Sequence, residues 1–249
     1  MTVHAELAPR DGVLQEEYQR LLGYPRERVL DGRASELAQM ARDWYRANGR
    51  PWTYARPASR LELTAGTLVI DGVAFNCAKL TATLRAANAH NVVLVAASAG
   101  PELEEEAQRR WQDEKPDEYF FLEVYGSAVV EQLVAAAGAR LCAEADAQNM
   151  AVLPHDSPGY PEWTISEQSM LLELVKQPGS AVLPGPMAVL ESGMLRPKKS
   201  LLAVFGLTHD AERVRRLTDM VPCERCALPR CQYRRVGYAR SKARSSVPI

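Results

Sequence analysis

The run NVVLVAASAG, residues 91–100, constrains the fold of this chain more than any other segment, because almost every residue in it is apolar. Its length and its valines predict a β-strand. A half-exposed strand alternates between apolar and polar residues, whereas a strand that is apolar throughout is covered on both faces. The sequence therefore predicts a strand at the centre of the fold, with other elements packed on each side of it.

Helix and strand patterns surround this segment in an order that does not repeat. Apolar residues at helical spacing predict helices over 12–22, 34–48, 77–88, 102–114 and 117–148, and another that begins near Ile165. Alternation and turn residues predict short strands between 52 and 75. Two strand-like runs, 181–195 and 200–208, are separated by RPKK and predict a hairpin. This order is typical of an α+β fold and not of repeated βαβ units.

The overall charge and hydropathy exclude several classes of function. The chain has 249 residues, of which 47% are hydrophobic, and this is enough for one large domain or two small ones. A net charge of -1 gives no general affinity for nucleic acid, although residues 230–244 are locally basic. We find no signal-peptide core and no apolar stretch that approaches the roughly 20 residues of a membrane span.

The cysteine count points to a reducing compartment. The chain has five cysteines, an odd number, and no secretion signal, so we expect no disulfide framework. We therefore expect a cytoplasmic protein with neither a nucleic-acid partner nor a membrane partner.

A stiff loop, SPGYP, precedes the helix that begins near Ile165. Pro158 fixes its own φ, Gly159 permits a positive φ, and Pro161 biases Tyr160 towards an extended backbone. The backbone on both sides therefore directs the tyrosine ring. The ring either plugs an edge of the core or forms a rigid platform for a flat ligand, with nearby backbone amides available to bind that ligand.

This loop and the residues after it resemble a known family. The runs SPGYPEW, EQSMLLELV and ESGMLRPKKSLLAVFG are similar to the activation domain of cobalamin-dependent methionine synthase, above all to its stand-alone version. The matching residues are Ser157, Pro158, Gly159, Tyr160, Trp163, Glu167, Gln168, Met194, Pro197, Lys199 and Ser200. The similarity covers residues 70–235 and is most specific around 157–205.

The resemblance implies a C-shaped α+β fold with a twisted antiparallel sheet and flanking helices. On this basis we divide the chain into three parts. Residues 1–60 form an N-terminal segment of helix and strand that packs on the main domain, residues 61–220 form the activation-domain-like core, and residues 221–249 form a basic tail that contains cysteines.

The resemblance also implies a function. In the family, the domain binds S-adenosylmethionine and meets a cobalamin cofactor that a partner holds, and it serves the reductive reactivation and methylation of that cofactor. We therefore expect an accessory protein for a corrinoid (vitamin B12)-dependent methyltransferase, with S-adenosylmethionine as the methyl donor. The expected partners are a corrinoid protein or the methyltransferase itself, and a flavodoxin- or ferredoxin-type electron donor.

The family's ligand positions carry over to this chain one by one. Tyr160 corresponds to the loop tyrosine on the cobalamin-facing side. Five positions before it, where the family has an arginine that binds the carboxylate of S-adenosylmethionine, this chain has His155. The acidic residue expected on the preceding helix falls near Ala135, and an aromatic residue expected on the hairpin falls near Leu201.

The residues of the loop form the expected ligand-facing surface. Two carboxylates beside the tyrosine, Asp156 and Glu162, either contact the ligand or are simply solvated. We assign the surface that faces S-adenosylmethionine or cobalamin to His155, Ser157, Pro158, Gly159, Tyr160 and Glu162.

Three cysteines, Cys223, Cys226 and Cys231, stand close together as C-x2-C-x4-C. Thiolates at this density suit an iron–sulfur cluster or a zinc ion, and a cluster here would be an entry point for electrons. Otherwise the thiols are unligated or act as a structural staple. A zinc site needs a fourth ligand. The candidates for that ligand are Cys77, Cys142 and His209, of which the two cysteines are otherwise expected to be buried and structural.

Two further interpretations stand beside the first. In one, the fold is retained without S-adenosylmethionine binding, and the chain is a non-catalytic or iron–sulfur electron-transfer subunit of a corrinoid methyltransferase system. In the other, the chain is a structural subunit that only completes a methyltransferase complex.

Overall fold

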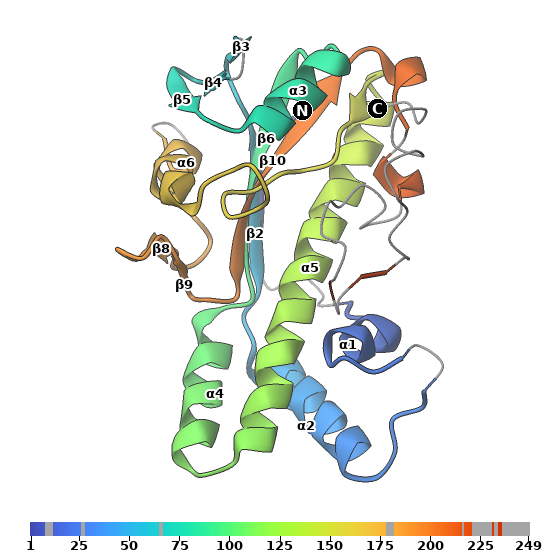
Figure 1. Cartoon of the computed structure of the whole chain (residues 1–249), viewed down its shortest axis with the longest axis vertical. Helices are drawn as coiled ribbons and strands as arrows, with labels where there is room; N and C mark the ends of the chain where they lie inside the picture. The colour runs from blue at the N-terminus through green and yellow to red at the C-terminus, as the bar shows by residue number, and fades with distance from the viewer. Residues whose placement is uncertain are drawn as a thin grey trace.

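A computed structural model describes residues 1–7, 12–25, 28–64, 67–177, 182–215, 217–220, 231, 234 and 235. Helices and antiparallel strands follow one another irregularly, so the expected α+β class is confirmed (Figure 1). The α-helices are α1 (Gln15–Leu21), α2 (Gly32–Asn48), α3 (Ala78–Ala86), α4 (Pro101–Gln112), α5 (Pro116–Asp146) and α6 (Gln168–Val175). Short 3-10 turns are η1 (Ile165–Glu167), η2 (Ala211–Arg213) and η3 (Leu217–Asp219).

The described strands form one main sheet and two small ones, all antiparallel. The main sheet has the order β1-β2-β6-β10-β7, with β1 (His4–Leu7), β2 (Trp52–Pro57), β6 (Asn91–Ser98), β10 (Ser200–Thr208) and β7 (Ala151–Val152). The small sheets are β3 (Leu61–Leu63) with β4 (Leu68–Ile70) and β5 (Val73–Phe75), and β8 (Ala188–Val189) with β9 (Leu195–Arg196).

The central strand β6 is buried on both faces, as its apolar sequence predicts. Val93 and Val95 point into one hydrophobic cluster, and Val92 and Leu94 point into another on the opposite face. The neighbouring strand β10 alternates in the same way, with Phe205 in the first cluster. The main sheet therefore separates two cores, and most of the remaining chain covers one core or the other.

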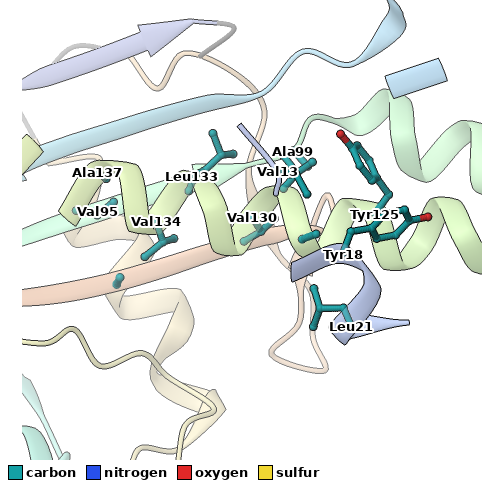
Figure 2. Close-up of a cluster of buried hydrophobic side chains, with 14 of the residues drawn as sticks. Val13, Tyr18, Leu21, Val95, Ala99, Tyr125, Val130, Leu133, Val134 and Ala137 are labelled. Carbon is teal, nitrogen blue, oxygen red and sulfur yellow. The ribbon is translucent and has the colours of Figure 1, made fainter. Parts of the chain in front are cut away.

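Helix α5 covers the first face of the main sheet. Its buried residues Val130, Leu133, Val134 and Ala137 recur at helical spacing and lie against the sheet near Val95 (Figure 2). This stripe fixes which side of α5 faces the sheet and which side faces away from it.

Helices α1 and α2 pack on the same helix through tyrosines. The ring of Tyr125 on α5 lies edge-on to Tyr18 at 5.0 Å and to Tyr45 at 5.6 Å between centroids. The Tyr18 hydroxyl donates to the Phe121 carbonyl at 2.8 Å, and the Tyr45 hydroxyl donates to the Ala99 carbonyl at 2.7 Å. These buried hydroxyls are therefore satisfied by backbone acceptors.

Helix α5 also corrects one expectation. It has the length and the composition of a membrane span, although we expected no such segment. Its most apolar window is 56% buried inside the protein. Since its apolar stripe packs against the sheet, we interpret α5 as the core helix of this fold.

The second face of the main sheet is covered by α3, α6 and the β3-β4-β5 sheet. Phe75, Leu84, Leu171 and Trp163 meet there as fully or almost fully buried side chains, with Phe75 edge-on to Trp163 at 5.8 Å between centroids. Trp163 belongs to the SPGYPEW segment. The candidate loop is thereby tied to this second core.

The prediction of a hairpin formed by residues 181–195 and 200–208 is wrong. β9 pairs with β8, whereas β10 pairs with β6 from Ser200 opposite Ser98 to Leu207 opposite Asn91. The RPKK segment therefore links two sheets. The physical reason lies in β10 itself, because a strand that is apolar on both faces must pair in the centre of a covered sheet.

Gly206 on β10 generates a test of this packing. A β-carbon there would overlap the Leu84 side chain and would lie 2.8 Å from Leu153 Cδ1. We expect Gly206→Ala to lower the free energy of unfolding by about 1–3 kcal/mol in urea denaturation, because overpacking forces neighbours to move. Leu84→Ala removes the nearest neighbour, so adding Gly206→Ala to that variant should cost much less. Strictly additive effects would contradict the packing described here.

Candidate functional site

The SPGYPEW loop consists of two consecutive tight turns. The Tyr160 N–H donates to the Ser157 carbonyl at 3.0 Å, and the Trp163 N–H donates to the Tyr160 carbonyl at 3.0 Å. Each turn has a proline at its second position, where the restricted φ of proline suits a type II turn. The Gly159 N–H donates to the Trp163 carbonyl at 2.9 Å and closes the loop. These hydrogen bonds, together with the two prolines, make the loop rigid, as the sequence predicts.

The third position of each turn requires a positive φ. Gly159 supplies it in the first turn with φ +93°, at no steric cost. Glu162 occupies the same position in the second turn with φ +71°, where a side chain costs roughly 1–2 kcal/mol. Strained residues of this kind gather at functional sites. The exposed Glu162 carboxylate therefore stands beside Tyr160 at the expense of local stability.

Backbone pairings hold both ends of the loop. Asp156 forms an antiparallel bridge with Val204 of β10, and Trp163 forms one with Cys77 at the start of α3. Cys77 is 1% exposed, and burial raises the pKa of its thiol to about 12, which agrees with a structural role. In Figure 1 the chain runs from the end of α5 across the central strands to α6, and the loop lies on this path.

Two residues of the family-like motif are structural. The buried Glu167 carboxylate accepts from Trp163 Nε1 at 2.9 Å and from the Asn76 backbone N–H at 3.1 Å. Gln168 Nε2 donates to the Gly193 carbonyl at 2.7 Å and so ties α6 to the β8-β9 hairpin. These side chains hold the loop in place and do not form the surface it presents.

Tyr160 lies at the surface and is 39% exposed as a residue, whereas its hydroxyl is buried. The rings of Phe205, His155 and Tyr160 form a series from the core to the surface. Centroid distances are 5.0 Å between Phe205 and His155 and 6.0 Å between His155 and Tyr160. The His155 ring therefore supports Tyr160 on the side of the core, and the ligand platform stays a prediction.

The backbone amides expected to bind a ligand are already used. The loop consumes the N–H groups of Ser157, Gly159, Tyr160 and Trp163 internally, and Pro158 and Pro161 have none. The expectation of available amides is therefore wrong for these residues. The turns that make the loop rigid also take up its donors.

Ser157 contributes an acceptor within the loop. Ser157 is 0% exposed, and its side chain interacts with the Tyr160 hydroxyl, which lowers the pKa of Tyr160 against the larger effect of burial. This contact ties the tyrosine side chain back to the first turn of the loop.

His155 differs from the arginine that the family resemblance leads us to expect. Burial, followed by the charge of Lys79, lowers the pKa of the ring from an ordinary 6.5 to about 4. The imidazole is therefore neutral at physiological pH. A neutral ring offers a carboxylate one hydrogen bond and no charge, whereas arginine offers a charged, two-pronged fork.

Asp156 lies on the other side of this strand-like segment from His155. Its Oδ2 pairs with Lys79 Nζ at 3.3 Å, and its Oδ1 accepts from the Ser157 N–H at 3.0 Å. Burial raises the pKa of the Asp156 carboxyl, against the opposing effect of Lys79. The structure therefore places Asp156 as a buried anchor of the loop, whereas Glu162 remains exposed.

An acidic residue does face the loop, although not at the expected position. The structure has Glu131 one helical turn before Ala135, and both lie on the exposed side of α5. Burial of the Tyr160 hydroxyl raises the pKa of that group, and the Glu131 carboxylate raises it further. Glu131 Oε2 also accepts from Arg20 at 2.8 Å and from Arg235 at 3.1 Å, so its charge is partly compensated. Glu131 lies four residues before Ala135, and this helical spacing is the sequence signal that could have identified it.

The expected second aromatic residue has no counterpart at Leu201. Leu201 is half-buried against the α5-side core and pairs with Ala97. It lies four residues from Phe205 along β10, which corresponds to about 13 Å. The structure therefore keeps Leu201 in the core and away from the loop.

The cysteine site falls mostly outside the described residues, since Cys223 and Cys226 are not among them. Cys231 is described as a free, half-buried cysteine. Within the described part of the chain, no group of three or more histidine, cysteine or acidic residues is placed to hold a metal. The iron–sulfur or zinc site stays a prediction, and of its suggested fourth ligands Cys142 is half-buried and His209 stacks on His90 at 4.0 Å.

Tyr160 and the exposed Glu131 link the loop to α5, because the Glu131 carboxylate raises the pKa of Tyr160. Two hollows lie elsewhere, one over α3 and one of about 550 Å³ beside His209 and Asp210. The loop and this part of α5 together offer a partly exposed tyrosine and the exposed carboxylates of Glu131 and Glu162. Such a set complements a ligand that carries positive charge and hydrogen-bond donors.

Comparison with known proteins gives a fold relationship. The structure is similar to the crystal structure of the MetH reactivation domain bound to AdoHcy, with a TM-score of 0.61 over 87% of this chain and 81% of that chain. The sequence identity is 14%. No known sequence family and no curated protein matches the chain significantly. The chain therefore has the activation-domain fold that its motifs resemble.

The neutral state of His155 predicts a pH dependence of stability. Between pH 6.5 and about 4 the unfolded chain binds a proton at this residue and the folded chain does not, so stability falls as the pH falls through this range. We expect a loss on the order of 3 kcal/mol from His155. Urea denaturation at several pH values measures it, with His155→Gln as the control that does not titrate. Equal losses in both proteins would contradict the lowered pKa.

Proposed function

We propose that this chain is an accessory protein for a corrinoid-dependent methyltransferase and assists the reductive reactivation and methylation of cobalamin held by a partner. The observation that carries the proposal is the rigid double turn that presents Tyr160, placed within the fold of the MetH reactivation domain. S-adenosylmethionine, when bound, supplies the methyl group.

Two features of the site support S-adenosylmethionine as the ligand. The Glu131 carboxylate near Tyr160 complements a positive sulfonium or ammonium group. The partly exposed Tyr160 provides an aromatic surface, and its backbone is held by two turns, so little ordering entropy is lost on binding.

One feature supports the alternative. The neutral His155 does not supply the charge that a ligand carboxylate needs, and nearby Arg20 and Arg235 are engaged with Glu131. This observation favours a non-catalytic or iron–sulfur electron-transfer subunit of a corrinoid methyltransferase system that has lost S-adenosylmethionine binding. In that case Tyr160 and its loop would serve only the contact with the partner.

Calorimetry with S-adenosylmethionine on anaerobically purified protein separates the two. We expect binding that weakens about 10-fold in Tyr160→Ala, because an aromatic contact is lost. His155→Arg should strengthen binding about 10-fold, since it restores a charged fork for the carboxylate. Tyr24→Ala is the matched control, because Tyr24 also precedes a proline in a turn but packs against the α5-side core.

The outcomes discriminate between the functions. Binding that Tyr24→Ala leaves unchanged and Tyr160→Ala weakens supports the methyl-donor proposal. Absence of binding at millimolar ligand, in wild type and in His155→Arg, would contradict it. Iron and sulfide analysis of the same preparations then separates the two forms of the alternative, because the iron–sulfur subunit requires both elements to be present and to be lost in Cys226→Ser, whereas the non-catalytic subunit requires neither.

A further inference from the structure

The two edges of the main sheet differ in how they are protected. At one edge, β7 has two residues, and Pro154 follows soon after it. Short edge strands and prolines discourage pairing with other strands. At the other edge lies β1, with four residues and neither proline nor lysine between Met1 and Leu7. Among the described residues β1 pairs with β2 alone, so its outer side has no strand partner in this part of the chain.

The side chains of β1 and its preceding residue divide cleanly between the two faces of the sheet. His4 and Glu6 lie on the α5 side, opposite Ala55 and Thr53 of β2. The apolar residues lie on the other side, where Val3 is 52% and Leu7 is 72% exposed and Ala5 is also exposed. An edge strand with an exposed apolar row is a site where a second strand gains burial on pairing.

We propose that this chain forms a two-fold symmetric dimer in which β1 pairs antiparallel with β1 of a second copy. A two-fold axis at Ala5 places Ala5 opposite its own copy, Val3 opposite Leu7, and His4 opposite Glu6. The apolar row of one copy thus meets the apolar row of the other, and the His4 imidazole faces the Glu6 carboxylate, with which it can form a hydrogen bond. The strand is self-complementary in this register.

Charges on the α5 side extend this complementarity. Within one chain His4 contacts Glu144, and Arg140 contacts Glu6. Pairing at Ala5 places the His4–Glu144 pair of one copy beside the Glu6–Arg140 pair of the other. The side chains then follow in the order Glu144, His4, Glu6, Arg140 across the interface, so that each carboxylate lies beside an imidazole or a guanidinium group, and the symmetry produces this series twice. Opposite charges on facing strands stabilise pairing, and like charges oppose it.

Other registers lack this match. A two-fold axis at His4 places His4 opposite itself, and an axis at Glu6 places two carboxylates opposite each other. A shift by one residue pairs Ala5 with Glu6, whose side chains point to opposite faces of the sheet. The register centred on Ala5 is therefore the one that places complementary side chains opposite each other on the same face of the sheet.

The dimer leaves the candidate site open. The Asp156 bridge joins the loop segment to β10 on the β7 side of the sheet, whereas β1 is at the opposite end of the strand order. Association through β1 therefore does not require the His155–Tyr160 surface. This inference is independent of the proposed function.

Light scattering coupled to size-exclusion chromatography of the full chain at about 0.1 mM tests the dimer. We expect twice the chain mass of 27.6 kDa for wild type and for Ala5→Thr, a neutral control that suits a strand. Ala5→Lys and Ala5→Glu each place like charges at the axis and should elute as monomers. Far-UV circular dichroism establishes that both variants remain folded.

Mixing the two charged variants is the decisive step. An equal mixture of Ala5→Lys and Ala5→Glu should return to the dimer mass, because the axis then joins opposite charges. A monomeric wild type, dimers of the separate charged variants, or a mixture that stays monomeric would each overturn the proposal. A monomeric wild type that binds strand peptides would instead assign the edge to another protein.

Discussion

Burial of β6 and β10 on both faces is the constraint on which the rest of the structure depends. Two neighbouring strands without a polar face require a covering layer on each side, and the chain supplies α5 on one side and α3 with α6 on the other. The pairing also explains why β10 separates from β9 after the RPKK segment. Because both faces of the main sheet are covered, irregular backbone reaches its central strands only from an edge of the sheet.

The candidate loop uses one of these edges. Beyond β7, the chain continues beside β10 only as far as the Asp156 bridge and then turns twice. The turns consume the loop's amides and place Glu162 in a left-handed conformation. The internal hydrogen bonds of the two turns thus make the loop rigid and also use up its backbone donors. What the loop presents outward is the Tyr160 ring and the Glu162 carboxylate.

Much of the fold was predictable because the signals are local. Helical spacing located α2 and α5, and the apolar run located β6. Pairing was harder to predict: β1 partners a strand about 50 residues away, and β10 skips its neighbour in sequence because burial outweighs proximity. In the site, the turn residues were predictable from Pro158, Gly159 and Pro161. The position of Glu131 and the neutral state of His155 follow from helix packing and burial, which sequence motifs do not contain.

We propose that the Tyr160 loop and the adjacent part of α5 bind S-adenosylmethionine. Backbone amide NMR of the labelled protein, titrated with S-adenosylmethionine, tests this binding residue by residue. We predict saturable shifts confined to Gly159, Tyr160, Glu162 and the segment of α5 around Glu131, with the distant strand β1 unaffected. Absence of shifts at millimolar ligand, or saturable shifts located elsewhere on the protein, would contradict the account.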